Sequence, residues 1–163
     1  VVMAVSSKPA LANFCTVSGF LSGNLSNPNS EKSCGGRSPG YYKSKHGVPH
    51  DDPTTFHKVF DGVWRGNDGV YWSPPDMMGK GTPTFYEVLN MGGNNDHYEF
   101  GAHAIAAYLN AHNIVGYGLK PEEVTTMVYD IITNGVYTHP GTGKTLDAHD
   151  FVYFITQTFS DYY

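Results

Sequence analysis

The stretch DHYEFGAHAIAAYLNAHN, residues 96–113, decides the fold of this chain. Its apolar residues recur at helical spacing in one stripe, widened by its neighbours: Phe100, Ala104, Ala107 and Ala111, with Ile105, Tyr108, Leu109 and His112 beside them. The pattern predicts a helix from about Asp96 to Asn113. Its many alanines allow other elements to pack closely against it, so we expect it at the centre of the domain.

Two further helices are predicted after this one. Pro121 and the acids that follow it are typical of a helix start, and Gly135 is typical of an end. A last helix is predicted from about Asp147 to Phe159. The predicted core faces meet in one set of buried side chains: Ile105, Leu109, Val128, Ile131, Phe151 and Ile155.

The N-terminal half predicts less regular structure. Residues 13–50 are rich in Gly, Ser, Asn and Pro, which indicates an ordered loop region with at most short strands or turns. A short helix is predicted from Asp52-Pro53 to about Asp61, and another follows a Thr84 cap and stops at Gly92-Gly93. Asp68-Gly69 is compatible with a short hairpin between them.

The expected fold is therefore mainly α, a small helical domain of about four to five helices with a long disulfide-closed N-terminal loop region. The chain of 163 residues suits one domain over residues 13–163, preceded by an apolar segment, residues 1–12. No apolar stretch approaches the roughly 20 residues of a membrane span.

Charge and composition limit the kinds of molecule that this protein is expected to bind. The net charge of -5 and the 10 scattered Lys and Arg residues argue against binding to nucleic acid. Charged residues make up 15% of the chain and 12 residues are Tyr. Because tyrosine joins a rigid apolar ring to a polar tip, this composition favours contact with other macromolecules, although tyrosines half-buried under long loops explain it equally well.

Cys15 and Cys34 are 19 positions apart in the Gly-rich region, and we expect them to form a disulfide. Such a bridge contributes about 3 kcal/mol by restricting the unfolded chain. No CxxC or CxxCH spacing supports zinc or haem. Ala10-Leu11-Ala12 has the A-x-A pattern of a signal-peptidase site, which together with the disulfide predicts an extracellular or cell-surface location.

Few residues suggest chemistry. Residues 140–145 resemble a phosphate loop, but the pattern requires Gly where Thr138 stands, so we interpret them as a turn before the last helix. His46, His50 and Asp51 form a weak candidate metal site, and we expect no cofactor. Five acids offer carboxylates for a hydrolase: Asp68, Asp76, Glu87, Asp96 and Glu99. Asn24 begins a formal glycosylation sequon.

Residues 34–43, CGGRSPGYYK, resemble the opening of a poorly characterised exported bacterial domain with a C-G-x-S-P-G-Y-W-K-N-H type motif. Residues 100–111 are similar to that domain's alanine-rich central helix. Tyr42 stands where the motif has Trp, and Ala102 where a basic residue is common. The resemblance implies export and a helical core, and it implies no catalytic residue.

Three functions follow as hypotheses. The first is a non-enzymatic structural protein that assembles with copies of itself into a surface layer or filament. Its self-association residues would lie at the two ends of the chain: Val1, Val2, Met3, Val5, Tyr162 and Tyr163. The alternatives are a module that binds surface glycans through Trp64, Tyr71 and Trp72, and a secreted hydrolase. We expect residues 1–12 to dock on a neighbouring copy, or else to fold back on their own domain.

Overall fold

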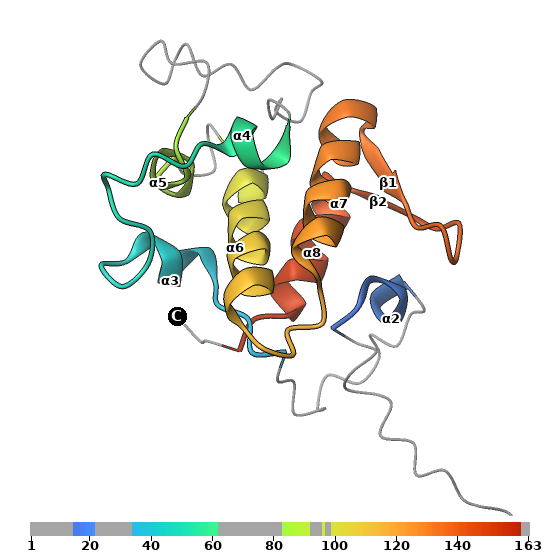
Figure 1. The fold of residues 1–163 in the computed structure, drawn as a ribbon. Coiled ribbons are helices and arrows are strands. Elements are labelled where there is room, and N and C mark those ends of the chain that lie inside the picture. Colours follow the sequence, from blue (N-terminus) through green and yellow to red (C-terminus); the bar gives the residue numbers. More distant parts are fainter. Residues whose placement is uncertain (1–14, 22–33, 62–82, 92–95, 97–98, 161–163) are drawn as a thin grey trace, which may run out of the picture.

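The computed structural model describes residues 15–21, 34–61, 83–91, 96 and 99–160. These residues form seven helices and two short strands (Figure 1). In chain order the elements are α2 (Val17–Leu21), α3 (Pro39–Lys43), α4 (Phe56–Phe60), α5 (Phe85–Leu89), α6 (Phe100–Asn113), α7 (Pro121–Asn134), β1 (Val136–Thr138), β2 (Thr145–Asp147) and α8 (Ala148–Gln157). The predicted mainly helical class is confirmed, with more helices than the four to five expected.

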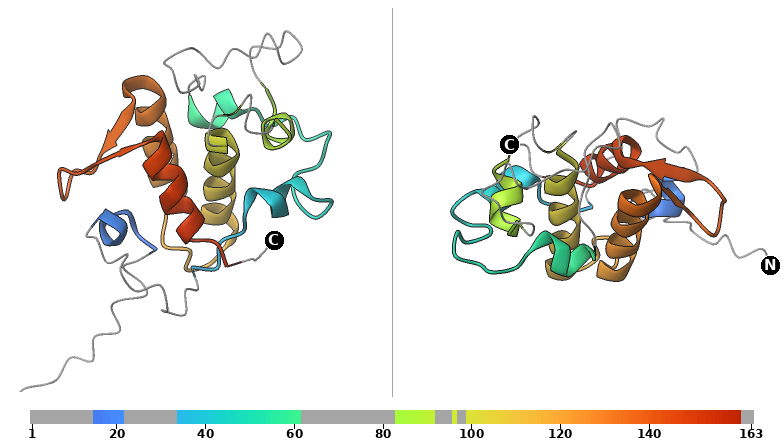
Figure 2. Two further views of the ribbon diagram at one scale, coloured as in Figure 1. Left: turned by 180° about the vertical axis from the view of Figure 1, so that it is seen from behind. Right: turned by 90° about the horizontal axis from the view of Figure 1, so that it is seen from above.

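Helix α6 lies at the centre of the fold, with α3 and α5 to one side and α7 and α8 to the other (Figures 1 and 2). Every residue from Phe100 to Ala107 is buried. A helix covered on all sides needs small side chains where its neighbours approach. At Gly101, for example, an added Cβ would lie 2.8 Å from a methyl group of Val88 on α5.

The start of α6 differs from the prediction. The helix begins at Phe100, and Glu99 before it has a left-handed backbone with φ of 54°. Asp96 is buried outside the helix, where its carboxylate accepts hydrogen bonds from the backbone N–H groups of Gly101 and Ala102 at 2.8 and 2.9 Å. The Asp96 carboxylate thus pairs with backbone N–H groups of the first turn that have no partner within the helix. The helical spacing of apolar residues does not reveal this role.

Local capping signals place the starts of three other helices as predicted, whereas α5 ends at Leu89, before the predicted stop at Gly92-Gly93. Pro121 begins α7, and Gly135 ends it with φ of 83°. Asp147 caps α8, and Thr84 caps α5 through a reciprocal capping box with Glu87. The ends of α8 lie within two residues of the predicted ones.

Residues 13–50, which were expected to form a loop region with at most short strands or turns, contain the two short helices α2 and α3. The prediction for this region was wrong in part. In α3, Ser38 caps the helix by accepting from the N–H of Tyr41, and Pro39 occupies the first turn. The next helix, α4, begins at Phe56 after a Thr55 cap, not at Asp52. The Asp52 carboxylate instead accepts from the N–H of Thr54 at 2.8 Å in the turn before it.

The hairpin of the described chain joins α7 to α8. Strands β1 and β2 pair antiparallel, with Val136 opposite Asp147 and Thr138 opposite Thr145. The sequence predicted only a turn here, and the hairpin considered at Asp68-Gly69 lies outside the described residues. Because β2 runs directly into Asp147, the hairpin fixes where α8 starts.

The core lies between α6, α7 and α8. Ile105, Val128, Ile131, Phe151 and Ile155 are buried in one cluster, as predicted. Leu109 is only partly buried, because the buried position of that turn is taken by the next residue, Asn110. None of the described helices has the length and apolar character that a bilayer crossing requires.

Candidate functional site

The predicted disulfide is present. Cys15 and Cys34 are bonded, with their Cα atoms 5.7 Å apart, and both are buried. The bond attaches the residues before α2 to the segment that leads into α3. It therefore connects the short helices α2 and α3, which have few residues for packing against the core.

Asn110 is a fully buried amide on α6 that fixes this segment to the core. Its side-chain carbonyl accepts from the hydroxyl of Tyr42 at 2.7 Å and from the backbone N–H of Arg37 at 2.9 Å. Its amide group donates to the carbonyl of Arg37 at 3.0 Å. Asn110 was not predicted from the sequence. The feature that could have pointed to it is an amide side chain within the mostly apolar residues 100–111.

The C-terminal end of α8 runs beside the same segment. Gly36 donates to the carbonyl of Thr158 at 3.1 Å and accepts from the N–H of Ser160 at 2.8 Å. An added Cβ at Gly36 would lie 2.6 Å from the Thr158 carbonyl, so the approach needs glycine. The buried hydroxyl of Tyr117 contacts that of Thr158 at 2.7 Å, and burial raises the pKa of Tyr117. These polar groups are occupied within the fold, which indicates a structural role.

His103 is a nearly buried histidine on α6. Burial lowers the pKa of its imidazole, and the effect outweighs the opposing influence of Glu99. Nδ1 lies 2.8 Å from the Glu99 carbonyl, and the ring stacks on Phe159 with centroids 5.8 Å apart. The uncharged ring therefore acts as a packing group that also satisfies one backbone carbonyl.

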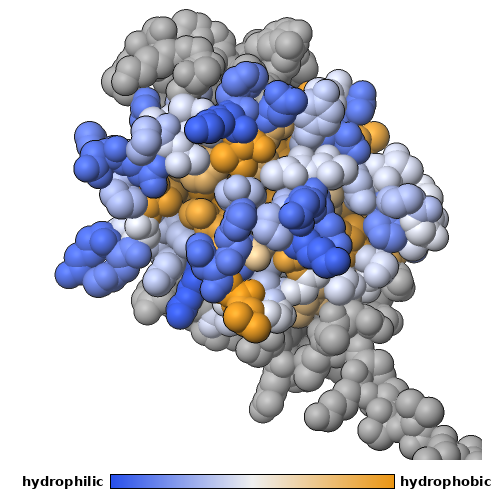
Figure 3. Space-filling model, in the orientation of Figure 1, coloured by the Kyte–Doolittle hydropathy of each residue, from blue (hydrophilic) through white to orange (hydrophobic). Residues whose placement is uncertain are grey.

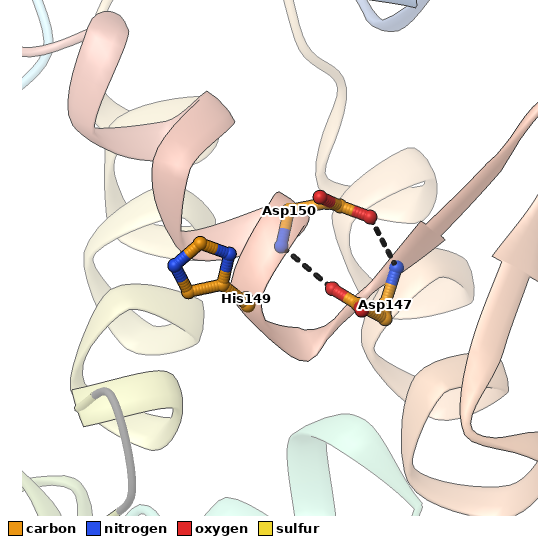
Figure 4. A group of neighbouring side chains, drawn as sticks. All are labelled: Asp147, His149 and Asp150. Atoms are coloured by element: carbon orange, nitrogen blue, oxygen red, sulfur yellow. Dashed lines mark hydrogen bonds between the residues drawn. The ribbon is translucent and has the colours of Figure 1, made fainter.

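One group of three metal-ligand side chains occurs among the described residues: Asp147, His149 and Asp150 (Figure 4). The two aspartates form the capping box of α8. Asp147 accepts from the N–H of Asp150 at 2.8 Å, and Asp150 accepts from the N–H of Asp147 at 3.2 Å. Helix capping accounts for this arrangement without a cation.

The candidate metal residues from the sequence are not brought together. His46, His50 and Asp51 are exposed, and they do not form a group of neighbouring ligand atoms. The ring of His50 instead packs edge-on against Tyr86 of α5, with centroids 4.7 Å apart. The described residues thus give no support to a metal site at this loop.

Two of the carboxylates considered for hydrolysis, Asp96 and Glu87, serve as helix caps, whereas Glu99 is exposed. Asp96 caps α6, and Glu87 accepts from the N–H and hydroxyl of Thr84 at 3.4 and 3.1 Å in the capping box of α5. The second carboxylate oxygen of Glu87 is buried without a hydrogen-bond partner. Asp68 and Asp76 lie outside the described residues, as do the glycan-binding candidates Trp64, Tyr71 and Trp72.

Three large apolar side chains are exposed on the elements that follow α6. Tyr129 of α7, Val136 of β1 and Tyr153 of α8 are exposed by 41%, 38% and 47%. We call these three residues the apolar set. On the face seen in Figure 3, hydrophilic side chains dominate and apolar ones show between them. The predicted self-association residues at both chain ends lie outside the described residues.

Comparisons with models of known protein families, with curated protein sequences and with solved structures give no match. The resemblance to an exported bacterial domain stays a prediction. The geometry of the described side chains is thus the basis for a functional proposal.

Proposed function

We propose that this protein is an extracellular structural subunit that assembles with copies of itself. The exposure of the apolar set carries the proposal. Tyr129, Val136 and Tyr153 belong to α7, β1 and α8, and β2 lies between the last two in the chain. Large apolar side chains gathered on neighbouring elements are typical of contact surfaces, and tyrosine is enriched in them.

The hairpin offers a second means of contact at this surface. The sheet consists of β1 and β2 alone within the described residues, so each strand has one edge without a strand partner. Such edges pair readily with another chain. Residues 1–12 carry apolar side chains and are proposed to dock on a neighbouring copy; deletion of this segment would then reduce assembly.

The Cys15–Cys34 disulfide supports the extracellular part of the proposal. Disulfides persist in oxidising compartments and on cell surfaces, and they are rare in a reducing cytosol. A subunit of an exposed assembly also benefits from a covalent restraint on its least regular segment.

Assembly is tested with the full, oxidised chain by sedimentation velocity and negative-stain electron microscopy over a range of concentrations. We expect filaments or sheets whose formation is weakened by the double variant Tyr129→Ser, Val136→Thr. The matched control is Val115→Thr, because Val115 is fully exposed but lies in the turn before α7, away from the hairpin. A dispersed monomer at all concentrations would contradict the proposal.

A further inference from the structure

We infer that the contact between copies is head-to-tail and electrostatically matched: a basic corner at α3 of one copy docks on an acidic face formed by α7, the hairpin and α8 of the next. The basic corner consists of Arg37, Lys43 and Lys45. The acidic face consists of Glu122, Glu123, Asp130, Asp147 and Asp150. This inference rests on the proposed self-assembly and specifies the two surfaces that meet.

The basic corner lies in a segment whose Asp, Glu, Lys and Arg positions are all basic, and the two residues that follow the segment, Asp51 and Asp52, are acidic. Residues 34–50 contain three basic residues and no acid. All three basic side chains belong to exposed residues. Asn110 holds the backbone of Arg37 at both its N–H and its carbonyl, and the guanidinium lies 4.9 Å from the centroid of the Tyr41 ring. Because its backbone is fixed to α6, this charge is positioned before any partner arrives.

The acidic face carries the opposite charge. Residues 121–160 contain five acids and a single basic residue, Lys144, whose ammonium group donates to the Leu21 carbonyl at 2.7 Å. Glu122, Glu123 and Asp147 are exposed. The negative potential is felt locally: burial and then the charges of Glu123 and Asp130 raise the pKa of Tyr137 on β1.

The two surfaces lie on opposite sides of α6 (Figures 1 and 2). The basic corner and the acidic face of one copy therefore cannot contact each other. When copies dock head-to-tail, the copy at one end keeps a free basic corner and the copy at the other end keeps a free acidic face. A contact between two different surfaces that does not close into a ring produces an open filament. This arrangement distinguishes the inference from a two-fold dimer.

The chemistry of the acidic face fits a protein partner of this kind. The same elements carry the apolar set, so a docked copy would cover Tyr129 and Val136 while acids at the margin pair with Lys43 and Lys45. Interfaces commonly have such an apolar centre and polar rim. Charge complementarity at the rim sets orientation and speeds association.

Charge reversal tests the pairing. The variant Lys43→Glu, Lys45→Glu changes the net charge of the basic corner from +3 to -1, and the variant Glu122→Lys, Asp130→Lys changes that of the α7 part of the acidic face from -3 to +1. We expect each alone to need at least about tenfold higher concentration to assemble, because like charges then face each other. An equimolar mixture should assemble again, with the two variants alternating. Neither variant removes a capping residue, and circular dichroism checks that both are folded.

Lys58→Glu on α4 is the matched control, since it makes the same chemical change at an exposed lysine outside the basic corner. It should assemble like the unmodified chain. Unmodified chains that never assemble would overturn the proposed function itself. Assembly that is unchanged in both reversal variants, or a mixture of folded variants that stays dispersed, would overturn only the head-to-tail pairing.

Discussion

Helices α6 and α7 are both fourteen residues long and pack against each other, but they meet solvent differently. Helix α6 contains no Asp, Glu, Lys or Arg and is buried throughout its first two turns. Helix α7 buries Val124, Met127, Val128 and Ile131 on one side and exposes Tyr129, Glu122 and Glu123 on the other. The pair separates two tasks: α6 organises the core, and α7 presents a surface.

The largest expected effect is on core packing. Ile105→Ala in α6 should lower the free energy of unfolding by about 2–5 kcal/mol, because a fully buried side chain leaves a cavity. The matched change Ile132→Ala in the partly buried face of α7 should cost less than about 2 kcal/mol. Urea titration of the oxidised chain measures both. Equal costs would mean that α6 is not the more enclosed helix.

The buried amide of α6 provides the next comparison. Asn110→Ala removes three hydrogen bonds, one with the Tyr42 hydroxyl and two with the backbone N–H and carbonyl of Arg37. We expect a loss of about 2–4 kcal/mol. Asn134→Ala, at the exposed end of α7, should change stability by about 0.5 kcal/mol or less. A small effect at Asn110 would show that α3 is held by other contacts.

The buried histidine of α6, His103, predicts that the stability of the fold depends on pH. Since burial lowers the pKa of His103 below its usual 6.5, the unfolded chain takes up a proton more readily than the folded one. This contribution to stability is intact above pH 6.5 and is lost as the pH falls from there toward the lowered pKa. His103→Gln should flatten thermal stability against pH in that window. A slope that is unchanged in His103→Gln would contradict this assignment.

The smallest effect on stability is expected at the exposed side of α7. Tyr129→Ser should change the free energy of unfolding of the monomer by less than about 1 kcal/mol, because the ring is 41% exposed. Its effect on assembly should be the larger one. Differential scanning calorimetry at a concentration below assembly separates the two. A loss of several kcal/mol would assign the tyrosine to the fold instead of to a contact surface.

The start of α6 and the position of Leu109 show where sequence reasoning reached its limit. The apolar stripe predicted a helix from about Asp96, whereas the helix begins at Phe100 and the Asp96 carboxylate caps it from outside. The apolar period placed Leu109 in the core, whereas Asn110 occupies the buried position and bonds to α3. Both outcomes depend on partners that the local pattern does not contain.

The candidate sites were less predictable than the helices. The disulfide followed from two cysteines in a Gly-rich region and is present. His46, His50 and Asp51 were grouped by closeness in sequence, but a loop without regular structure gives no fixed spacing to its side chains. The apolar set escaped notice because Tyr129, Val136 and Tyr153 belong to three different elements, and only the packing of these elements decides which of their apolar side chains stay exposed.

The sequence by itself determined the helices whose ends carry their own signals. Pro121 and Gly135 for α7, Asp147 for α8 and Thr84 with Glu87 for α5 act through backbone groups within a few residues, so their effect is local. Tertiary structure alone decided the burial of the first two turns of α6 on all sides, the short helices α2 and α3, and the placement of the basic and acidic segments on opposite sides of α6 (Figure 1). A five-residue helix is too short to be stable in isolation, and a surface is formed by residues distant in the chain, so both depend on packing.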